Sequence, residues 1–217
     1  TRASFVKNNM VFYNQKVDVP AGKYHDAYFL ATATGGAKRA KLTFVYADGE
    51  RVVSELRVSD WAGQPQPAEV AAVRISGRYN VLGKQNLNVS LYATAIPLNP
   101  AKELIWIEFP EEVNIHLFAL SLGLAPNLLP IEGVEVFREP ISRPVDLRAQ
   151  FNQDGVGTQS NPADGNLDGV GWNLAAELMP PAGEVVKMAG VEWLMPEYTD
   201  GLPKNVQARG QLISMPK

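Results

Sequence analysis

Apolar and polar residues alternate along much of the chain, which is the pattern of a β-strand with one buried face. In the run 41–46, Leu42, Phe44 and Tyr46 fall on the same face. A second run repeats the pattern, with apolar residues on one face at Leu87, Val89, Leu91, Ala93 and Ala95. Each run is therefore predicted to be a strand that packs on a core through one face.

A hairpin is predicted around residues 47–50. Asp48 and Gly49 lie there, between the run 42–46 and another run at 52–58. An Asp-Gly pair between two alternating runs is a strong hairpin signal, because glycine adopts positive φ without steric cost. We expect 42–46 and 52–58 to pair as antiparallel strands.

Further strands are predicted wherever an apolar or alternating run lies between turn residues. They fall at 9–19, 26–33, 69–76, 103–109, 114–122, 145–151, 190–195 and 205–215. The 18 Gly and 16 Pro are spread along the chain and leave no room for long helices. Only 172–179 is a short helical candidate, and no βαβ alternation is present. The sequence predicts an all-β fold, an antiparallel β-sandwich or jelly roll with at most short helical turns.

Proline divides the chain into two β-rich segments, 1–124 and 145–217. The residues between them, 125–144, form a proline-rich connector that contains four prolines. About five strands in the second segment are too few to bury both of their faces, and unpaired strand edges are avoided in proteins. We expect 145–217 to pack on or complete 1–124, in the same chain or in a neighbouring copy. The alternative is a separate second β domain.

Charge and cysteine content exclude several classes of function. The 20 Lys+Arg and 23 Asp+Glu give a net charge of −3, and the basic residues are scattered, so a nucleic-acid partner is not expected. No apolar run approaches the roughly 18 residues that span a bilayer, so no membrane insertion is expected. The first residues have no signal-peptide core, and we expect a soluble mature chain or one whose targeting segment was removed. The absence of cysteine excludes disulfides, a thiol nucleophile and Cys-ligated metals.

Two sets of short motifs resemble the two halves of one kind of β-sandwich module. The front-half set lies at 151–156, 163–169, 175–178, 190–193, 204–206 and 210–211. The back-half set lies at 19–24, 29–33, 44–49, 59–61, 91–98 and 114–120. They resemble accessory, jelly-roll-like modules appended to bacterial secreted glycoside hydrolases. Here the two halves are in inverted order, and 9–20 is similar to 205–216, as in a permuted module or a piece of a tandem array.

The resemblance implies a non-catalytic module of a secreted bacterial carbohydrate-active enzyme, located outside the cell, at its surface or in the periplasm. Its expected partner is a glycan or polysaccharide, with a catalytic domain or another copy of the module as further partners. The rival interpretation is a structural, spacer or protein-docking module with no sugar ligand. A third interpretation is that the chain is itself a hydrolase.

Sugar contacts are predicted at loop aromatics, because the apolar faces of aromatic rings stack on the C–H groups of sugars. Trp61 lies at a strand end, Trp172 follows a glycine-rich loop, and Tyr79 lies in the polar loop 77–86. These three residues are the carbohydrate-binding candidates. Trp106 and Trp193 lie among aliphatic residues and are expected in the core.

A calcium loop is one interpretation of Asp164-x-Asn166-x-Asp168-Gly169, whose alternating oxygen ligands begin like an EF-hand. Position 12 of such a loop is Ala175, which has no carboxylate, so a standard EF-hand is rejected. A β-sandwich calcium site remains as one interpretation. The other is a turn in which these side chains cap their own backbone.

Catalytic residues are not expected. His25 and His116 are the only histidines, and no Gly-x-Ser-x-Gly elbow is present. Glu111 and Glu112 follow Pro110 between two predicted strands, which favours a solvated hairpin tip over a pair of catalytic carboxylates.

Overall fold

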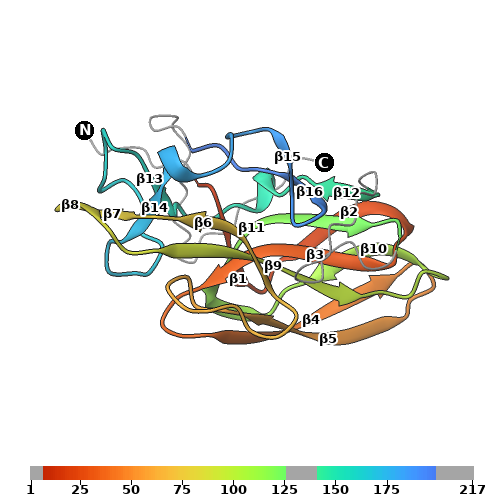
Figure 1. Ribbon diagram of the computed structural model, residues 1–217. Helices are drawn as coiled ribbons and strands as arrows, with labels where there is room; N and C mark the ends of the chain where they lie inside the picture. Colours follow the sequence, from red (N-terminus) through yellow and green to blue (C-terminus); the bar gives the residue numbers. More distant parts are fainter. Residues whose placement is uncertain (1–6, 126–140, 199–217) are drawn as a thin grey trace, which may run out of the picture.

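The computed structural model describes residues 7–125 and 141–198, which fold almost entirely as strands and turns (Figure 1). The large sheet has the order β1 (Met10–Tyr13), β11 (Glu111–Gly123), β3 (Asp26–Ala33), β9 (Val89–Pro97) and β6 (Val70–Ile75), and β12 (Ser142–Val145) also pairs with β11. The small sheet has the order β2 (Lys16–Lys23), β10 (Glu103–Glu108), β4 (Lys38–Tyr46) and β5 (Arg51–Val58). The predicted all-β antiparallel class is confirmed.

Two further sheets are short. One has the order β13 (Val156–Gly157), β14 (Asn173–Ala175), β7 (Arg78–Asn80) and β8 (Gly83–Gln85), and the other pairs β15 (Val185–Met188) with β16 (Val191–Leu194). The helical residues described are two 3-10 turns, η1 (Arg148–Gln150) and η2 (Ala176–Leu178). The short helix predicted at 172–179 is wrong for its first residues, because they extend as β14 to pair with β7.

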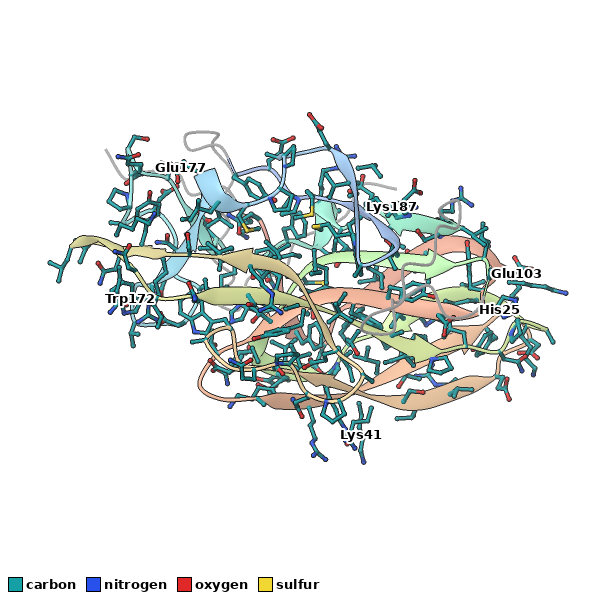
Figure 2. All side chains as sticks on the ribbon, viewed as in Figure 1. His25, Lys41, Glu103, Trp172, Glu177 and Lys187 are labelled. Atoms are coloured by element: carbon teal, nitrogen blue, oxygen red, sulfur yellow. The ribbon has the colours of Figure 1, made fainter. Side chains whose placement is uncertain are left out.

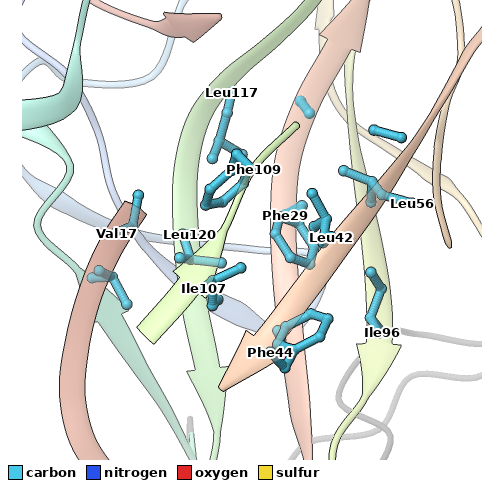
Figure 3. Packing of buried hydrophobic residues seen from close by; sticks show 14 of the residues in the cluster. Val17, Phe29, Leu42, Phe44, Leu56, Ile96, Ile107, Phe109, Leu117 and Leu120 are labelled. Atoms are coloured by element: carbon cyan, nitrogen blue, oxygen red, sulfur yellow. The ribbon is translucent and has the colours of Figure 1, made fainter. Parts of the chain in front are cut away.

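The first core lies between the large and small sheets (Figure 3). Leu42, Phe44 and Tyr46 all point into it from β4, as the alternation predicts. The rings of Phe12 and Phe109 meet edge to face, with their centroids 4.8 Å apart. Burial of this apolar surface is the main driving force that holds the two sheets together.

A second core covers the opposite face of the large sheet. Every residue of β3 is buried, because Phe29 and its alternate neighbours face the first core while Tyr28 and Leu30 face the second. Residues 141–198 close this second core, and Trp193 is fully buried in it. The described residues therefore form three layers, with β15 and β16 above the large sheet in Figure 1 and β4 and β5 below it.

Residues after 140 pair directly with strands of the first segment. Antiparallel β12 lies beside the end of β11, and β14 lies beside β7. The amides of Asn8 and Asn9 both donate to the Gln153 carbonyl, at 2.9 and 3.2 Å. Within the predicted connector, 126–140 lie outside the described residues, and its last residues form part of β12.

The hairpin and the strand at 26–33 are confirmed. β4 and β5 pair around Gly49, which has a φ of 88°, and β3 has the predicted bounds. The strand predicted at 9–19 is instead split into β1 and β2 at Asn14, whose φ is 56°. The strand predicted at 145–151 is wrong, because β12 ends at Val145 and η1 follows at Arg148–Gln150. The strand at 205–215, and with it the second copy of the repeat, lies outside the described residues.

Candidate functional site

A polar groove lies over the edge of the large sheet, where β6 and β9 meet two loops. It has a volume of about 540 Å³, within the range of about 300–1,000 Å³ typical of small-molecule sites. Its lining consists of Ala62, Gly63, Gln64, Pro65, Ala71, Arg74, Ile75, Ser76, Asn86, Leu87, Asn88, Val89, Ser90 and Tyr92.

The chemistry of the polar groove is that of amides and hydroxyls. Gln64, Asn86 and Asn88 supply side-chain amides, each of which both donates and accepts hydrogen bonds. Ser76 and Ser90 supply hydroxyl groups. The lining contains one formal charge, the guanidinium of Arg74, and neither a carboxylate nor a histidine.

Strand alternation places the polar groups on this face. On β6, Val73 and Ile75 are buried in the second core, while Arg74 between them is exposed. On β9, Val89 and Leu91 belong to the same core, so Ser90 lies on the other face. Arg74 and Ser90 are direct partners in the antiparallel register, which brings their side chains together at the groove.

The loop 62–65 that forms one wall is held by buried residues. The amide of Trp61 donates to the Ala33 carbonyl at 2.8 Å, and the carbonyl of Trp61 accepts from the Ser90 amide at 2.7 Å. The Tyr92 hydroxyl donates to the carbonyl of Gly63 at 2.8 Å. Because these bonds join the loop to β3 and β9, this wall of the groove is preformed in the absence of a ligand.

Two carboxylates lie near Tyr92 but are not part of the lining. Asp60 accepts from the Ala62 amide at 3.0 Å and from the Gly36 amide at 2.7 Å. Glu69 accepts from the Ser59 amide at 2.9 Å and from the Gln66 amide at 2.8 Å. Burial, and then the charges of Glu69 and Asp60, raise the pKa of the Tyr92 phenol, so it is a neutral hydrogen-bond donor at physiological pH.

The predicted aromatic candidates lie together, but their rings are not open platforms. Trp61 is 4% exposed and Tyr79 is 5% exposed, which corrects the expectation that both rings lie exposed on loops. The Tyr79 ring packs in the second core, on β7 between β14 and β8. Trp172 is half-buried and lies at the same end of the molecule as β7, β8 and β14 (Figure 2). Sugar binding by these three residues stays a prediction.

The guanidinium of Arg78 lies over the rings of two of the aromatic candidates, Trp61 and Trp172. Its guanidinium carbon lies 4.0 Å from the ring centroid of Trp172 and 5.1 Å from that of Trp61. Its Nε also donates to Oε1 of Gln85 at 2.7 Å. A cation over an aromatic face is a stabilising contact, so here the protein's own arginine takes positions that a stacked sugar would need.

Two of the three predicted calcium ligands are engaged in turns. The Asn166 Oδ1 accepts from the Gly171 amide at 2.8 Å, and the Asp168 Oδ1 accepts from the amides of Val170 and Trp172 at 3.0 Å. Asp164 is buried at 6% exposure. Over 7–125 and 141–198, no group of three or more His, Cys, Asp or Glu side chains is arranged to hold a metal ion. The geometry favours the turn interpretation, and calcium stays a prediction.

His116 is a buried structural residue. Its Nε2 lies 3.2 Å from the Thr34 hydroxyl and its Nδ1 lies 3.2 Å from the Asn9 Oδ1. Burial lowers the pKa of the His116 imidazole from 6.5 to about 4. Glu111 and Glu112 begin β11, where they pair with β1.

Of the two tryptophans expected in the core, one is there. Trp193 is fully buried. The expectation for Trp106 is wrong, because it is only half-buried on the outer face of the small sheet, with the Lys16 ammonium 3.7 Å from its ring centroid.

The polar groove is not apparent from the sequence. Its residues come from three separate stretches, 62–65, 71–76 and 86–92, and only the sheet brings them together. A local signal was present in Gln85-Asn86-Leu87-Asn88, where amide side chains cluster before β9.

Comparison with known proteins gives one family. A family model described as an AziU2-like beta-sandwich domain matches residues 1–125 and 141–217. No curated protein matches the chain. The match supports the β-sandwich part of the resemblance stated above, while the association with glycoside hydrolases stays a prediction. In the part of the chain that the structure describes, no helix has the length and apolar character to cross a membrane.

Proposed function

We propose that this chain, which belongs to the family of AziU2-like beta-sandwich domains, is a non-catalytic module that binds a saccharide in its polar groove. The observation that carries the proposal is the groove itself, a cavity of about 540 Å³ lined by amide and hydroxyl side chains on a fixed wall.

The lining of the groove fits the chemistry of a sugar. A sugar hydroxyl both donates and accepts, and the amides of Gln64, Asn86 and Asn88 offer both functions. Pro65 and Leu87 add apolar atoms that can contact the C–H groups of a ring. A site that combines a few polar groups with apolar surface orients its ligand through the polar groups.

The absence of acid and base groups from the lining supports a binding role. Glycoside hydrolysis generally uses two carboxyl groups on either side of the scissile bond. The lining of the groove contains none, and the nearby carboxylates of Asp60 and Glu69 accept backbone amides. The proposal therefore assigns no reaction to the groove.

The setting that we propose for this module is an accessory part of a secreted bacterial carbohydrate-active enzyme, outside the cytoplasm. Its support is the resemblance of the motifs in both segments to such accessory modules. Its partners in this proposal are a glycan and a catalytic domain.

Titration calorimetry with a panel of neutral and acidic oligosaccharides tests the proposal. Each lost hydrogen bond typically costs about 0.5–1.5 kcal/mol, so the double variant Gln64→Ala/Asn88→Ala is expected to bind roughly ten times more weakly than the wild type. Both residues are exposed, so the fold is retained.

The matched control is Asn99→Ser, which removes an exposed amide outside the groove. Asn99 follows the end of β9, whereas the groove lies at the start of that strand. Its Oδ1 accepts from the Ala101 amide at 3.0 Å, and the serine hydroxyl keeps an oxygen acceptor for this turn. The control is expected to bind as tightly as the wild type.

A protein-docking module is the second candidate, and the tip of the β7–β8 hairpin favours it. Val81 is 75% exposed and Leu82 is 91% exposed. Exposed apolar side chains at a projecting tip are typical of a contact with another protein. If no saccharide in the panel binds at millimolar concentration, this candidate replaces saccharide binding.

A further inference from the structure

We infer that the saccharide of the polar groove is anionic and that Arg74 binds its carboxylate or sulfate group. This inference rests on the proposed function and names the class of ligand for the same groove.

The guanidinium of Arg74 is accessible to a ligand in the polar groove. Arg74 lies on β6, the edge strand of the large sheet, between the buried residues Val73 and Ile75. Its side chain is exposed and lines the groove opposite Ser90. Within 7–125 and 141–198, its guanidinium makes no ion pair and no side-chain hydrogen bond.

Most other described arginines have partners within the chain. Arg39 and Arg57 pair with Glu55, Arg51 with Glu108, Arg148 with Asp146, and Arg78 stacks on Trp61 and Trp172. Arg143 has no such partner either, but it lies on β12 and does not line the groove. Arg74 thus combines an uncommitted guanidinium with a position in a polar cavity.

The nearby carboxylates do not take this role from Arg74. Asp60 and Glu69 each accept two backbone amides, whose dipoles offset part of their charge. The charge of Asp60 also faces Arg78, whose protonated form it stabilises. Neither carboxylate lines the groove. The guanidinium of Arg74 is therefore the one charged group of the lining that a bound ligand contacts.

A planar guanidinium binds carboxylate and sulfate groups through two parallel N–H bonds, which are stronger than hydrogen bonds between neutral groups. The amides of Gln64, Asn86 and Asn88 remain for the ring hydroxyls. The groove therefore fits a sugar that carries one anionic group among several hydroxyls, such as a uronic acid or a sulfated sugar.

Calorimetry with matched ligand pairs tests this inference. One pair is trigalacturonate and its methyl ester, which differ in charge but keep the same hydroxyls. The other pair is a sulfated galactan oligosaccharide and its desulfated form, which distinguishes a sulfate ester from a carboxylate as the source of the charge. The variants are Arg74→Gln, Arg74→Lys and the control Arg143→Gln, which removes an exposed arginine outside the groove.

For one of the pairs, the wild type is expected to bind the charged member about tenfold more tightly than the neutral one. Arg74→Gln removes this preference, Arg74→Lys restores part of it, and Arg143→Gln keeps all of it. Equal affinity of the wild type for both members of both pairs overturns the role of Arg74 but leaves a saccharide site. Tight binding of the charged ligand by Arg74→Gln would likewise overturn the role of Arg74 and leave a saccharide site. If no charged or neutral saccharide binds, the proposed function itself is wrong.

Discussion

Acidification is predicted to destabilise the fold through His116. The imidazole is 1% exposed and faces the Asn9 Oδ1 and the Thr34 hydroxyl, so the protonated form loses its hydration without gaining a carboxylate partner. Its pKa is lowered from 6.5 to about 4 in the folded protein. The unfolded chain therefore binds a proton at a higher pH than the folded chain does.

The direction and the size of the effect follow from this difference. The stabilisation is fully present above pH 6.5 and is lost as the pH falls through 6.5 towards about 4. The whole difference corresponds to about 3 kcal/mol at 1.36 kcal/mol per unit, and about 2 kcal/mol of it is lost by pH 5. Stopping at pH 5 keeps ordinary carboxyl groups largely ionised.

Urea denaturation of the wild type and of His116→Gln at pH 7.5, 6 and 5 measures the effect. The glutamine keeps a donor and an acceptor but cannot be protonated in this range. The wild type is expected to lose about 2 kcal/mol more than the variant between pH 7.5 and 5. Parallel stability curves for the two proteins would show that burial does not depress the pKa of His116.

Two other predictions concern the aromatic and calcium candidates of the sequence. Trp172→Ala removes a ring that stacks on Arg78; we expect a loss of about 0.5–2 kcal/mol of stability in urea, with saccharide affinity unchanged in calorimetry. A large loss of affinity would instead restore Trp172 as the sugar-binding residue. Because Asn166 and Asp168 already accept backbone amides, EDTA is expected to leave the melting temperature unchanged. A fall of several degrees, reversed by added Ca²⁺, would support a calcium site.

Local signals were sufficient to predict the sandwich. The Asp48-Gly49 pair located the β4–β5 hairpin, and alternation assigned Leu42 and Phe44 to a buried face. These features depend on residues that are neighbours in sequence, where the two-residue period of a strand can be recognised. β3 is buried on both faces, and its nearly continuous apolar sequence is the pattern expected of such a strand.

The groove and the state of the aromatic candidates depended on tertiary contacts. The Trp61 ring packs in the second core, and its backbone bonds to Ala33 and Ser90, residues that lie 28 and 29 positions away in sequence, hold it there. The Arg78 side chain meets Trp172 only because β7 pairs with β14. No periodicity or motif within one stretch of sequence reveals such tertiary contacts. The burial of Trp61 could therefore not be predicted from its position at a strand end.

Nuclear magnetic resonance of the ¹⁵N-labelled chain tests most directly whether the polar groove binds a saccharide. The side-chain amide signals of Gln64, Asn86 and Asn88 report on the lining directly. Trigalacturonate and neutral oligosaccharides are titrated to millimolar concentration, with the side-chain amide of Asn99, beyond the far end of β9, as an internal reference outside the groove. Saturable shifts of the three groove amides are expected with at least one saccharide, and no shift is expected for Asn99. Unchanged groove amides at millimolar saccharide, or shifts confined to residues outside the groove, would contradict saccharide binding in the groove.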